Sequence, residues 1–224
     1  ELELQRRTEE LERQNERLDQ FASVVSHDLR NPLNVIHGRM TLARETGEEE
    51  HFDRMDRAIR RMENIIDDML TLARQGQTVE EREWLDLEDT ARSAWANVDT
   101  ADATLAIDTD REVSADRSRI LQLFENLFRN AVEHGGDGVT ITVGDLMDGF
   151  YVADDGPGIP AEEREQVLEQ GFTTADDGTG FGLAIVRNAV EAHGWSLAVR
   201  ESESGGARFD VTGLGEDAPV GPNI

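Results

Sequence analysis

Three side chains suited to nucleophilic chemistry lie close together in the segment VVSHDLRNPLNVI, residues 24–36. Asp28 adjoins His27 and is close enough to hold one imidazole nitrogen in its protonated form or to take its proton, which leaves the other nitrogen free as a nucleophile. In a helix, Asn31 lies one turn further along the same face. An isolated exposed histidine is most often idle, so the hypothesis of a reactive His27 depends on these two neighbours.

Pro32 bears on how the imidazole of His27 is approached. Proline has no backbone N–H, so the carbonyl of Asp28 loses its helical hydrogen bond and we expect the helix to bend there. The bend is expected just where a bulky donor would have to reach His27.

The residues before and around His27 show a coiled-coil pattern over residues 4–29. Apolar residues recur every seven positions, at Leu4, Leu11, Leu18 and Val25. Four positions after each of the first three come Thr8, Asn15 and Ala22, which gives the alternating d and a positions of a coiled coil. Val25 then takes a d position and His27 an f position, which faces solvent. Asn15 takes an a position, where a buried amide fixes the register of a dimer.

A second apolar stripe follows the polar break ETGEEE, residues 45–50. Its members recur at alternating steps of three and four residues: Phe52, Met55, Ile59, Met62, Ile66, Met69 and Ala73. The pattern predicts an antiparallel helical hairpin, and one apolar stripe per helix favours two copies joined as a four-helix bundle. A coiled coil that only dimerises is the alternative until His27 is considered.

The pattern changes after a polar linker, residues 76–84. We predict a helix over 86–98, strands over 104–108 and 112–115, and a helix over 116–134. Strands over 139–145 and 149–155 follow, then a short helix, a glycine-rich loop, a helix over 182–193 and strands over 195–201 and 206–212. The fold class is therefore α + α/β. Residues 1–75 form the hairpin, 85–214 an α/β sandwich, and 215–224 a tail expected to be disordered.

The segment SHDLRNPLN resembles the H-box of the sensor histidine kinases of two-component systems. The resemblance implies that His27 receives the γ-phosphoryl group of ATP, with Asp28 as its acid/base partner. It also implies that Asn31 positions water when the same protein dephosphorylates its response regulator. Residues 1–75 then correspond to the dimerisation and phosphotransfer domain of the family.

Motifs in the second half resemble those of the ATP-binding domain of this family, of the GHKL (Bergerat) type. Asn126 and Asn130 share a helix face in ENLFRNAVEHG, which resembles the N-box; two such asparagines are otherwise most often surface residues. The resemblance makes the amide oxygen of Asn130 a Mg²⁺ ligand. In DDGPGIP, Asp154 would accept a hydrogen bond from the adenine amino group, and Gly156 and Gly158 would let the backbone approach the ring.

Two further motifs complete the implied nucleotide site. Phe172 in GFTT resembles the aromatic residue at the start of the ATP lid, and the glycines of GTGFGLAIV precede an apolar helix whose first N–H groups can hold phosphates. The implied nucleotide-binding residues are Asn126, Asn130, Asp154, Gly156, Gly158, Phe172, Gly178, Thr179, Gly180, Gly182 and Leu183.

The charge around the expected phosphate site departs from the family pattern. The family often has a lysine three residues after the Mg²⁺-binding asparagine, where this chain has Glu133 followed by His134. The lid has no basic residue and contains Asp176 and Asp177. We therefore expect phosphate charge to be met by Mg²⁺, the helix N-terminus, Arg129 and bulk cations.

Two other functional classes compete with the kinase. Hydrolytic ATPases of the same fold place a glutamate base four residues before the metal-binding asparagine, but that position is Asn126, and Glu125 lies ~100° away around the helix. This favours phosphoryl transfer over hydrolysis. A nucleotide-binding scaffold without activity is the third class, and intact His27, Asn130 and Asp154 argue against it.

The composition limits the classes of partner that the chain can bind. The chain of 224 residues has 48 acidic against 22 basic side chains, a net charge of −26, no Lys and no Cys. Acidic residues spread over the whole chain indicate adaptation to a salt-loaded cytoplasm, as in a halophile, and argue against nucleic acid or an anionic membrane as partner. We expect a cytoplasmic homodimer that passes phosphate to a response regulator receiver domain. Its sensor is expected upstream of Glu1, and the full-length protein is compatible with membrane attachment.

Overall fold

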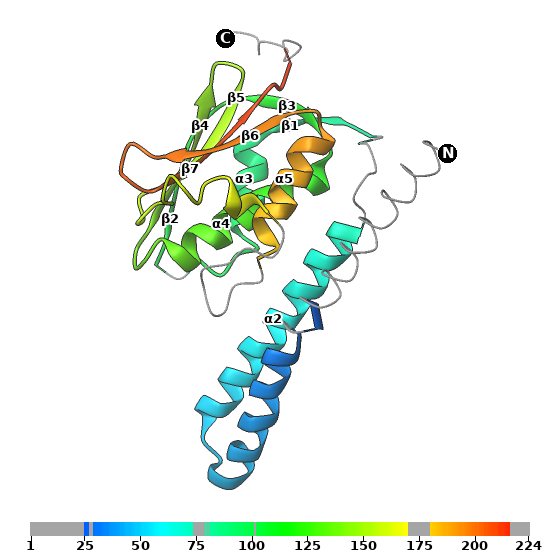
Figure 1. Ribbon diagram of the computed structural model, residues 1–224, viewed down its shortest axis with the longest axis vertical. Coiled ribbons are helices and arrows are strands. Elements are labelled where there is room, and N and C mark those ends of the chain that lie inside the picture. Colours follow the sequence, from blue (N-terminus) through cyan, green and yellow to red (C-terminus); the bar gives the residue numbers. More distant parts are fainter. Residues whose placement is uncertain are drawn as a thin grey trace, which may run out of the picture. The chain divides into compact units, whose positions relative to one another are not determined.

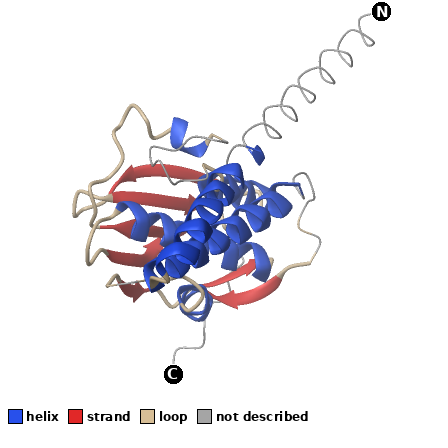
Figure 2. Ribbon diagram, turned by 90° about the horizontal axis from the view of Figure 1, so that it is seen from below, coloured by secondary structure: helices blue, strands red, loops and turns tan. Residues whose placement is uncertain are grey.

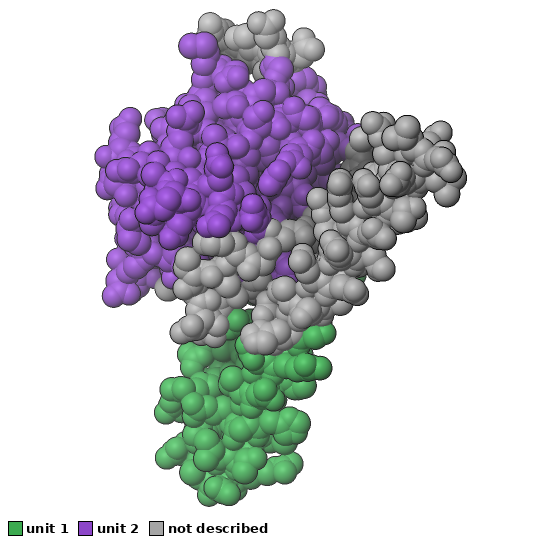
Figure 3. All heavy atoms as spheres, viewed as in Figure 1, with its two compact units in different colours: residues 1–70 green, residues 71–224 purple. Residues whose placement is uncertain are grey.

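The computed structural model describes residues 25–26, 29–73, 79, 81–100, 102–169 and 180–215. The chain divides into two compact units, residues 1–70 and residues 71–224 (Figure 3). Several predictions concern positions outside the described residues: those for His27, Asp28, Phe172, Gly178 and Thr179, for the coiled-coil positions 4–22, and for the tail after residue 215.

The first unit contains a helical hairpin, as predicted (Figure 1). Residues 29–46 are helical, residues 47 and 48 connect, and the helix α2 (Glu49–Ala73) follows. The first helix ends because Gly47 adopts a left-handed φ of 71°, from which its N–H donates to the carbonyl of Ala43 at 2.9 Å. Pro32 lies within the helical residues and is buried.

The apolar stripe predicted on α2 is only partly buried: some of its members are half-buried and the others are exposed. The most buried residues of the helix lie one position before the predicted stripe or between its members: His51, Ala58, Ile65 and Asp68. Met55, Met62 and Met69 are half-buried beside them. The remaining described members, Phe52, Ile59 and Ile66, are 52%, 44% and 45% exposed. The hairpin therefore buries only part of its apolar surface within one chain.

The second unit contains two sheets. The strands of the five-stranded sheet lie in the order β2 (Thr104–Asp108), β4 (Thr140–Leu146), β5 (Gly149–Asp154), β7 (Ala207–Thr212) and β6 (Ser196–Glu201). β2 and β4 are parallel and the other pairs are antiparallel. β1 (Glu83–Asp86) and β3 (Glu112–Ala115) form a separate antiparallel pair.

Three helices cover one face of the five-stranded sheet: α3 (Leu87–Trp95), α4 (Arg117–His134) and α5 (Gly182–Ala192) (Figures 1 and 2). A short 3-10 helix, η1 (Gln166–Leu168), precedes α5. The core between helices and sheet is aromatic at its centre, where the Phe124 ring on α4 lies 5.6 Å from both Phe128 and Phe150 and all three are fully buried. This packing holds α4 firmly on the sheet.

The observed elements confirm the predicted hairpin and α/β sandwich. The strands over 104–108 and 112–115 have the predicted bounds, and the other predicted elements differ by a few residues at their ends. β1 was not predicted, because Glu83 and its polar neighbours fall in the segment interpreted as a linker. Within the described part of the chain, no helix combines the length and apolar character of a membrane span.

Candidate functional site

Helix α4 carries both asparagines of the predicted nucleotide site. Its start is well defined, because the Asp116 carboxylate accepts hydrogen bonds from the backbone N–H groups of Ser118 and Arg119. Asn126 is 2% exposed and its Nδ2 donates to the carbonyl of Gln122 at 2.8 Å. That bond turns the Asn126 amide so that its oxygen faces away from its own helix backbone.

The amide oxygens of Asn126 and Asn130 converge on the first residue of α5. A Cβ atom built on Gly182 would lie 3.1 Å from Oδ1 of Asn126 and 3.4 Å from Oδ1 of Asn130. Gly182 therefore allows the start of α5 to approach α4 closely. Residues predicted to share one site, from segments more than 50 positions apart, do lie together.

No side-chain cap hydrogen bond is made at the described N-cap residue of α5. Phe181, at the N-cap position, is 1% exposed and its side chain caps no N–H group of the helix. Leu183 is half-buried and packs on the core. Gly180 adopts a φ of 66°, which favours glycine. The N-terminus of α5 thus offers backbone N–H groups and a positive dipole end beside two amide oxygens.

Asp154 lies at the end of β5, as predicted, and one of its carboxylate oxygens is held by the chain. Oδ1 accepts hydrogen bonds from the backbone N–H groups of Gly156 and Ala207, both at 3.0 Å. Among the described residues, no donor reaches Oδ2. This arrangement leaves one carboxylate oxygen available to a ligand in a fixed orientation.

The pKa of Asp154 is raised, chiefly because burial penalises its charged form. The hydrogen bonds from Ala207 and Gly156 oppose that effect, the charge of Asp155 adds to it, and His134 opposes it. A half-buried acceptor with a desolvated carboxylate forms a stronger hydrogen bond to a ligand than a solvated one would.

The glycines after Asp154 are explained by close backbone contacts. A Cβ atom on Gly156 would lie 2.6 Å from Cα of Gly135, at the end of α4. Gly158 has a φ of 73°, and a Cβ atom there would lie 2.7 Å from the carbonyl oxygen of Gly205. Three backbone segments thus meet around Asp154 without intervening side chains.

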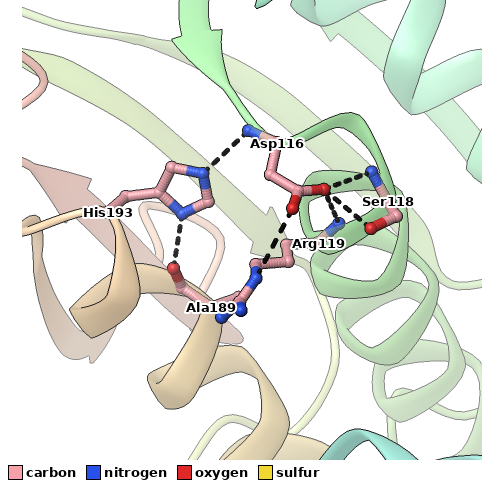
Figure 4. A network of polar contacts seen from close by, with 5 residues as sticks. All are labelled: Asp116, Ser118, Arg119, Ala189 and His193. Atoms are coloured by element: carbon pink, nitrogen blue, oxygen red, sulfur yellow. Dashed lines mark hydrogen bonds and ion pairs between the residues drawn. The ribbon is translucent and has the colours of Figure 1, made fainter. Parts of the chain in front are cut away.

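A buried histidine links α5 to α4 (Figure 4). His193, 4% exposed, accepts a hydrogen bond at Nε2 from the backbone N–H of Asp116, and its Nδ1 lies 2.6 Å from the carbonyl of Ala189. Its ring stacks on Trp195, with 4.5 Å between centroids. No sequence pattern marks this link, because it joins positions 77 residues apart.

The predicted site residues are thus distributed over two clusters. Asn126, Asn130 and Gly182 meet at the start of α5, and Asp154, Gly156 and Gly158 meet at the end of β5. Asn31 is exposed and lies in the other unit. Ser202 and Gly206, which contact Asp154, were missed; the only sequence signal was a glycine pair before β7.

Comparisons with known proteins identify both parts of the chain. Residues 17–78 match the His Kinase A (phospho-acceptor) domain, and residues 115–214 match the histidine kinase-, DNA gyrase B- and HSP90-like ATPases. The fold and the site therefore define a nucleotide-binding domain of that class joined to a phospho-acceptor hairpin. The chain belongs to the sensor histidine kinases of two-component systems.

Individual relatives support this assignment. The chain is 31% identical over 223 residues to sporulation kinase A of Bacillus subtilis, covering 92% of this chain and 37% of that protein. The structure of histidine kinase ThkA in complex with response regulator protein TrrA has a TM-score of 0.64 and 25% identity, over 90% of this chain and 64% of that chain. Full-length ShkA in complex with AMPPNP has a TM-score of 0.58 and 27% identity, over 88% and 47%.

The chain spans less than half of the length of curated relatives that it matches: 37% of sporulation kinase A, 29% of phytochrome-like protein Cph1 and 45% of sensor histidine kinase ZraS.

Proposed function

We propose that this chain transfers the γ-phosphoryl group of ATP to His27 and then to an aspartate of a response regulator. In the first step a P–N bond to one imidazole nitrogen forms as the bond from the γ-phosphorus to the ADP oxygen breaks, and Asp28 holds or takes the proton of the other nitrogen. The observation that carries the proposal is the convergence of Asn126 and Asn130 on the start of α5, in a chain whose residues 17–78 match a phospho-acceptor domain.

ATP is the nucleotide that this domain class binds. We assign the adenine amino group to the Oδ2 oxygen of Asp154, since Oδ1 is already engaged by two backbone N–H groups. Gly156 and Gly158 would border the ring. Phe172, Gly178, Thr179, Gly180, Gly182 and Leu183 are assigned to the lid and the phosphate-binding turn. Supporting this, the related ShkA structure contains AMPPNP.

Mg²⁺ fits the Asn130 end of the site. Hard oxygen donors suit this ion, which takes few protein ligands and completes its shell with water and phosphate oxygens. The amide oxygens of Asn130 and Asn126 both face the start of α5, where phosphates would be held. The ion would neutralise phosphate charge there, in a region where Glu133 replaces the lysine common in the family.

Hydrolysis is disfavoured by the position of Glu125. Its Oε1 accepts a hydrogen bond from Nδ2 of Asn97 at 2.8 Å, in the segment after α3. The neighbouring Asn126, which takes the place of a general base, cannot accept a proton from water. The γ-phosphoryl group is therefore preserved for a nucleophile on the protein.

The partners follow from the hairpin. We infer a homodimer, because Phe52, Ile59 and Ile66 are exposed on one side of α2 while the other side is buried within the hairpin. Leu33 and Met40 form a matching exposed pair on the first helix, at 45% and 36% exposure. A second copy that covers these residues would complete a four-helix bundle. A response regulator receiver domain is the proposed acceptor, supported by the ThkA complex with TrrA.

Labelling with γ-³²P-ATP tests the proposed activity. The wild-type chain is expected to retain an acid-labile, base-stable protein label, and His27→Gln to retain none while binding ATP normally. Undiminished label in His27→Gln, on His37, His51 or another residue, would contradict the assignment. Release of free phosphate without protein label would favour the hydrolytic class.

A further inference from the structure

The turn between β6 and β7 packs directly against Asp154. A Cβ atom on Gly206 would lie 2.1 Å from the carbonyl oxygen of Asp154 and 2.4 Å from its Oδ1. Gly206 is buried. The turn is therefore in backbone contact with the residue assigned to the adenine base.

Ser202 joins this turn to Asp154. Its hydroxyl donates to the Asp154 carbonyl at 2.7 Å and accepts from the N–H of Gly206 at 2.9 Å. The backbone of Ser202 also accepts from Gly205 N–H and donates to the Gly206 carbonyl, at 3.0 and 2.8 Å. Ser202 is 9% exposed, so water does not readily replace these bonds.

The position of Gly206 determines the position of Ala207, whose N–H donates to Oδ1 of Asp154. Ser202 therefore acts on Asp154 in two ways. It holds the backbone of Asp154 through the carbonyl, and it places Ala207 so that the carboxylate cannot rotate freely. The orientation of Oδ2, the oxygen without a donor among the described residues, follows from both.

We propose that Ser202 is a positioning residue that orients the Asp154 carboxylate toward the exocyclic amino group of adenine. The inference rests on the proposed function, in which Asp154 accepts a hydrogen bond from that group. Ser202 itself does not contact the nucleotide in this proposal. Its role is base discrimination, which is separable from overall stability.

The test compares two nucleotides on the full chain by calorimetry. ATP carries the 6-amino group, and purine riboside 5′-triphosphate lacks it. The wild type is expected to prefer ATP by roughly tenfold or more, since hydrogen bonds to charged groups are strong. Ser202→Ala should bind purine riboside triphosphate within about twofold of wild type and lose most of the preference for ATP.

Two variants serve as matched controls. Ser202→Thr retains the hydroxyl and should restore most of the preference. Ser204→Ala removes an exposed hydroxyl from the same turn and should leave both affinities unchanged. If Ser202→Ala does not fold, Ser202→Cys keeps nearly the same side-chain volume with a weaker donor, and its preference for ATP must also fall.

The measurements distinguish a failure of the role proposed for Asp154 from a failure of the role proposed for Ser202. A wild type without preference for ATP, unaffected by Asp154→Asn, would remove the assigned role of Asp154 and this inference with it. A wild-type preference that Ser202→Ala or Ser202→Cys keeps in full would overturn the role of Ser202 alone. Equal weakening of both nucleotides would make Ser202 merely structural and would also overturn the inference.

Discussion

The Nε2 atom of His193 accepts a hydrogen bond of 3.0 Å from the backbone N–H of Asp116. This bond joins the end of α5 to the residue that caps the start of α4. It requires Nε2 to be unprotonated, and Nδ1 then donates to the carbonyl of Ala189. Burial lowers the pKa of His193 from its ordinary 6.5; Arg82 and Arg119 add to this, while Asp116 and the Ala189 bond oppose it.

The first prediction concerns pH. An unfolded His193 takes up a proton below about pH 6.5, whereas the folded one stays neutral to lower pH. The second unit should therefore lose stability as the pH falls below 6.5, toward the lowered folded pKa. His193→Phe should cost about 1–3 kcal/mol at pH 7.5, because the Asp116 N–H loses its acceptor, and should flatten the pH dependence. Urea unfolding between pH 5 and 8 measures both; an unchanged slope in the variant would contradict the argument.

The second prediction concerns the approach of α5 to α4. Gly182→Ala places a methyl group 3.1 Å from Oδ1 of Asn126 and 3.4 Å from Oδ1 of Asn130, tighter than ordinary contact. We expect ATP affinity to fall roughly tenfold, about 1.4 kcal/mol, with little loss of folding. Gly38→Ala is the control, since nothing lies within 4 Å of its Cβ position. Calorimetry measures ATP affinity in Gly182→Ala and Gly38→Ala. Equal ATP affinities in the two variants would contradict the prediction, because they would show that α4 and α5 can move apart without weakening nucleotide binding.

The third prediction concerns the dimer. Ile59→Asp and Ile66→Asp place a charge on the exposed apolar side of α2 and should yield monomers. Light scattering in molar salt should give about twice 24.9 kDa for the wild type and one chain mass for the variants. Asn64→Asp adds the same charge at another exposed position and should remain dimeric. A wild type that is monomeric at micromolar concentration would refute the proposed bundle.

The fourth prediction concerns Asn31. If it positions water for removal of phosphate from the regulator, Asn31→Ala should reduce dephosphorylation of the regulator far more than autophosphorylation. Asn34→Ala, three residues further and also exposed, is the control. Equal loss of both reactions in Asn31→Ala would indicate a structural role.

The fifth prediction concerns salt. A protein of net charge −26 repels both itself and MgATP, and such repulsion reaches ~10 Å at 0.1 M salt but only ~3 Å at 1 M. Raising KCl from 0.1 M to above 1 M should raise the melting temperature and tighten ATP binding together. Binding must be measured on protein shown to be folded at both concentrations. A steady fall of ATP affinity with KCl would mean that cationic side chains hold the phosphates.

Much of the fold could be predicted because its signals are local. Alternating apolar residues predicted β4 and β5, and a helical period predicted α2. The spacing of Asn126 and Asn130 placed both amides on one helix face, and both amide oxygens do lie beside Gly182. The left-handed φ of Gly158 and Gly180 was not predicted. β1 escaped prediction because four residues, mostly exposed, become a strand only by pairing with β3.

The sequence by itself determined the element types and the hairpin and nominated candidate nucleotide-binding residues, because periodicity and residue chemistry are properties of short segments. Only the tertiary structure decided which side of α2 packs against the first helix of the hairpin and which side stays exposed. A repeat of about 3.5 residues identifies an apolar stripe but does not say which neighbouring helix covers that stripe. Tertiary structure also decided that Ser202 lies against Asp154 and His193 against Asp116. Those contacts join positions 48 and 77 residues apart, and only the packing of whole strands and helices brings them within hydrogen-bonding distance.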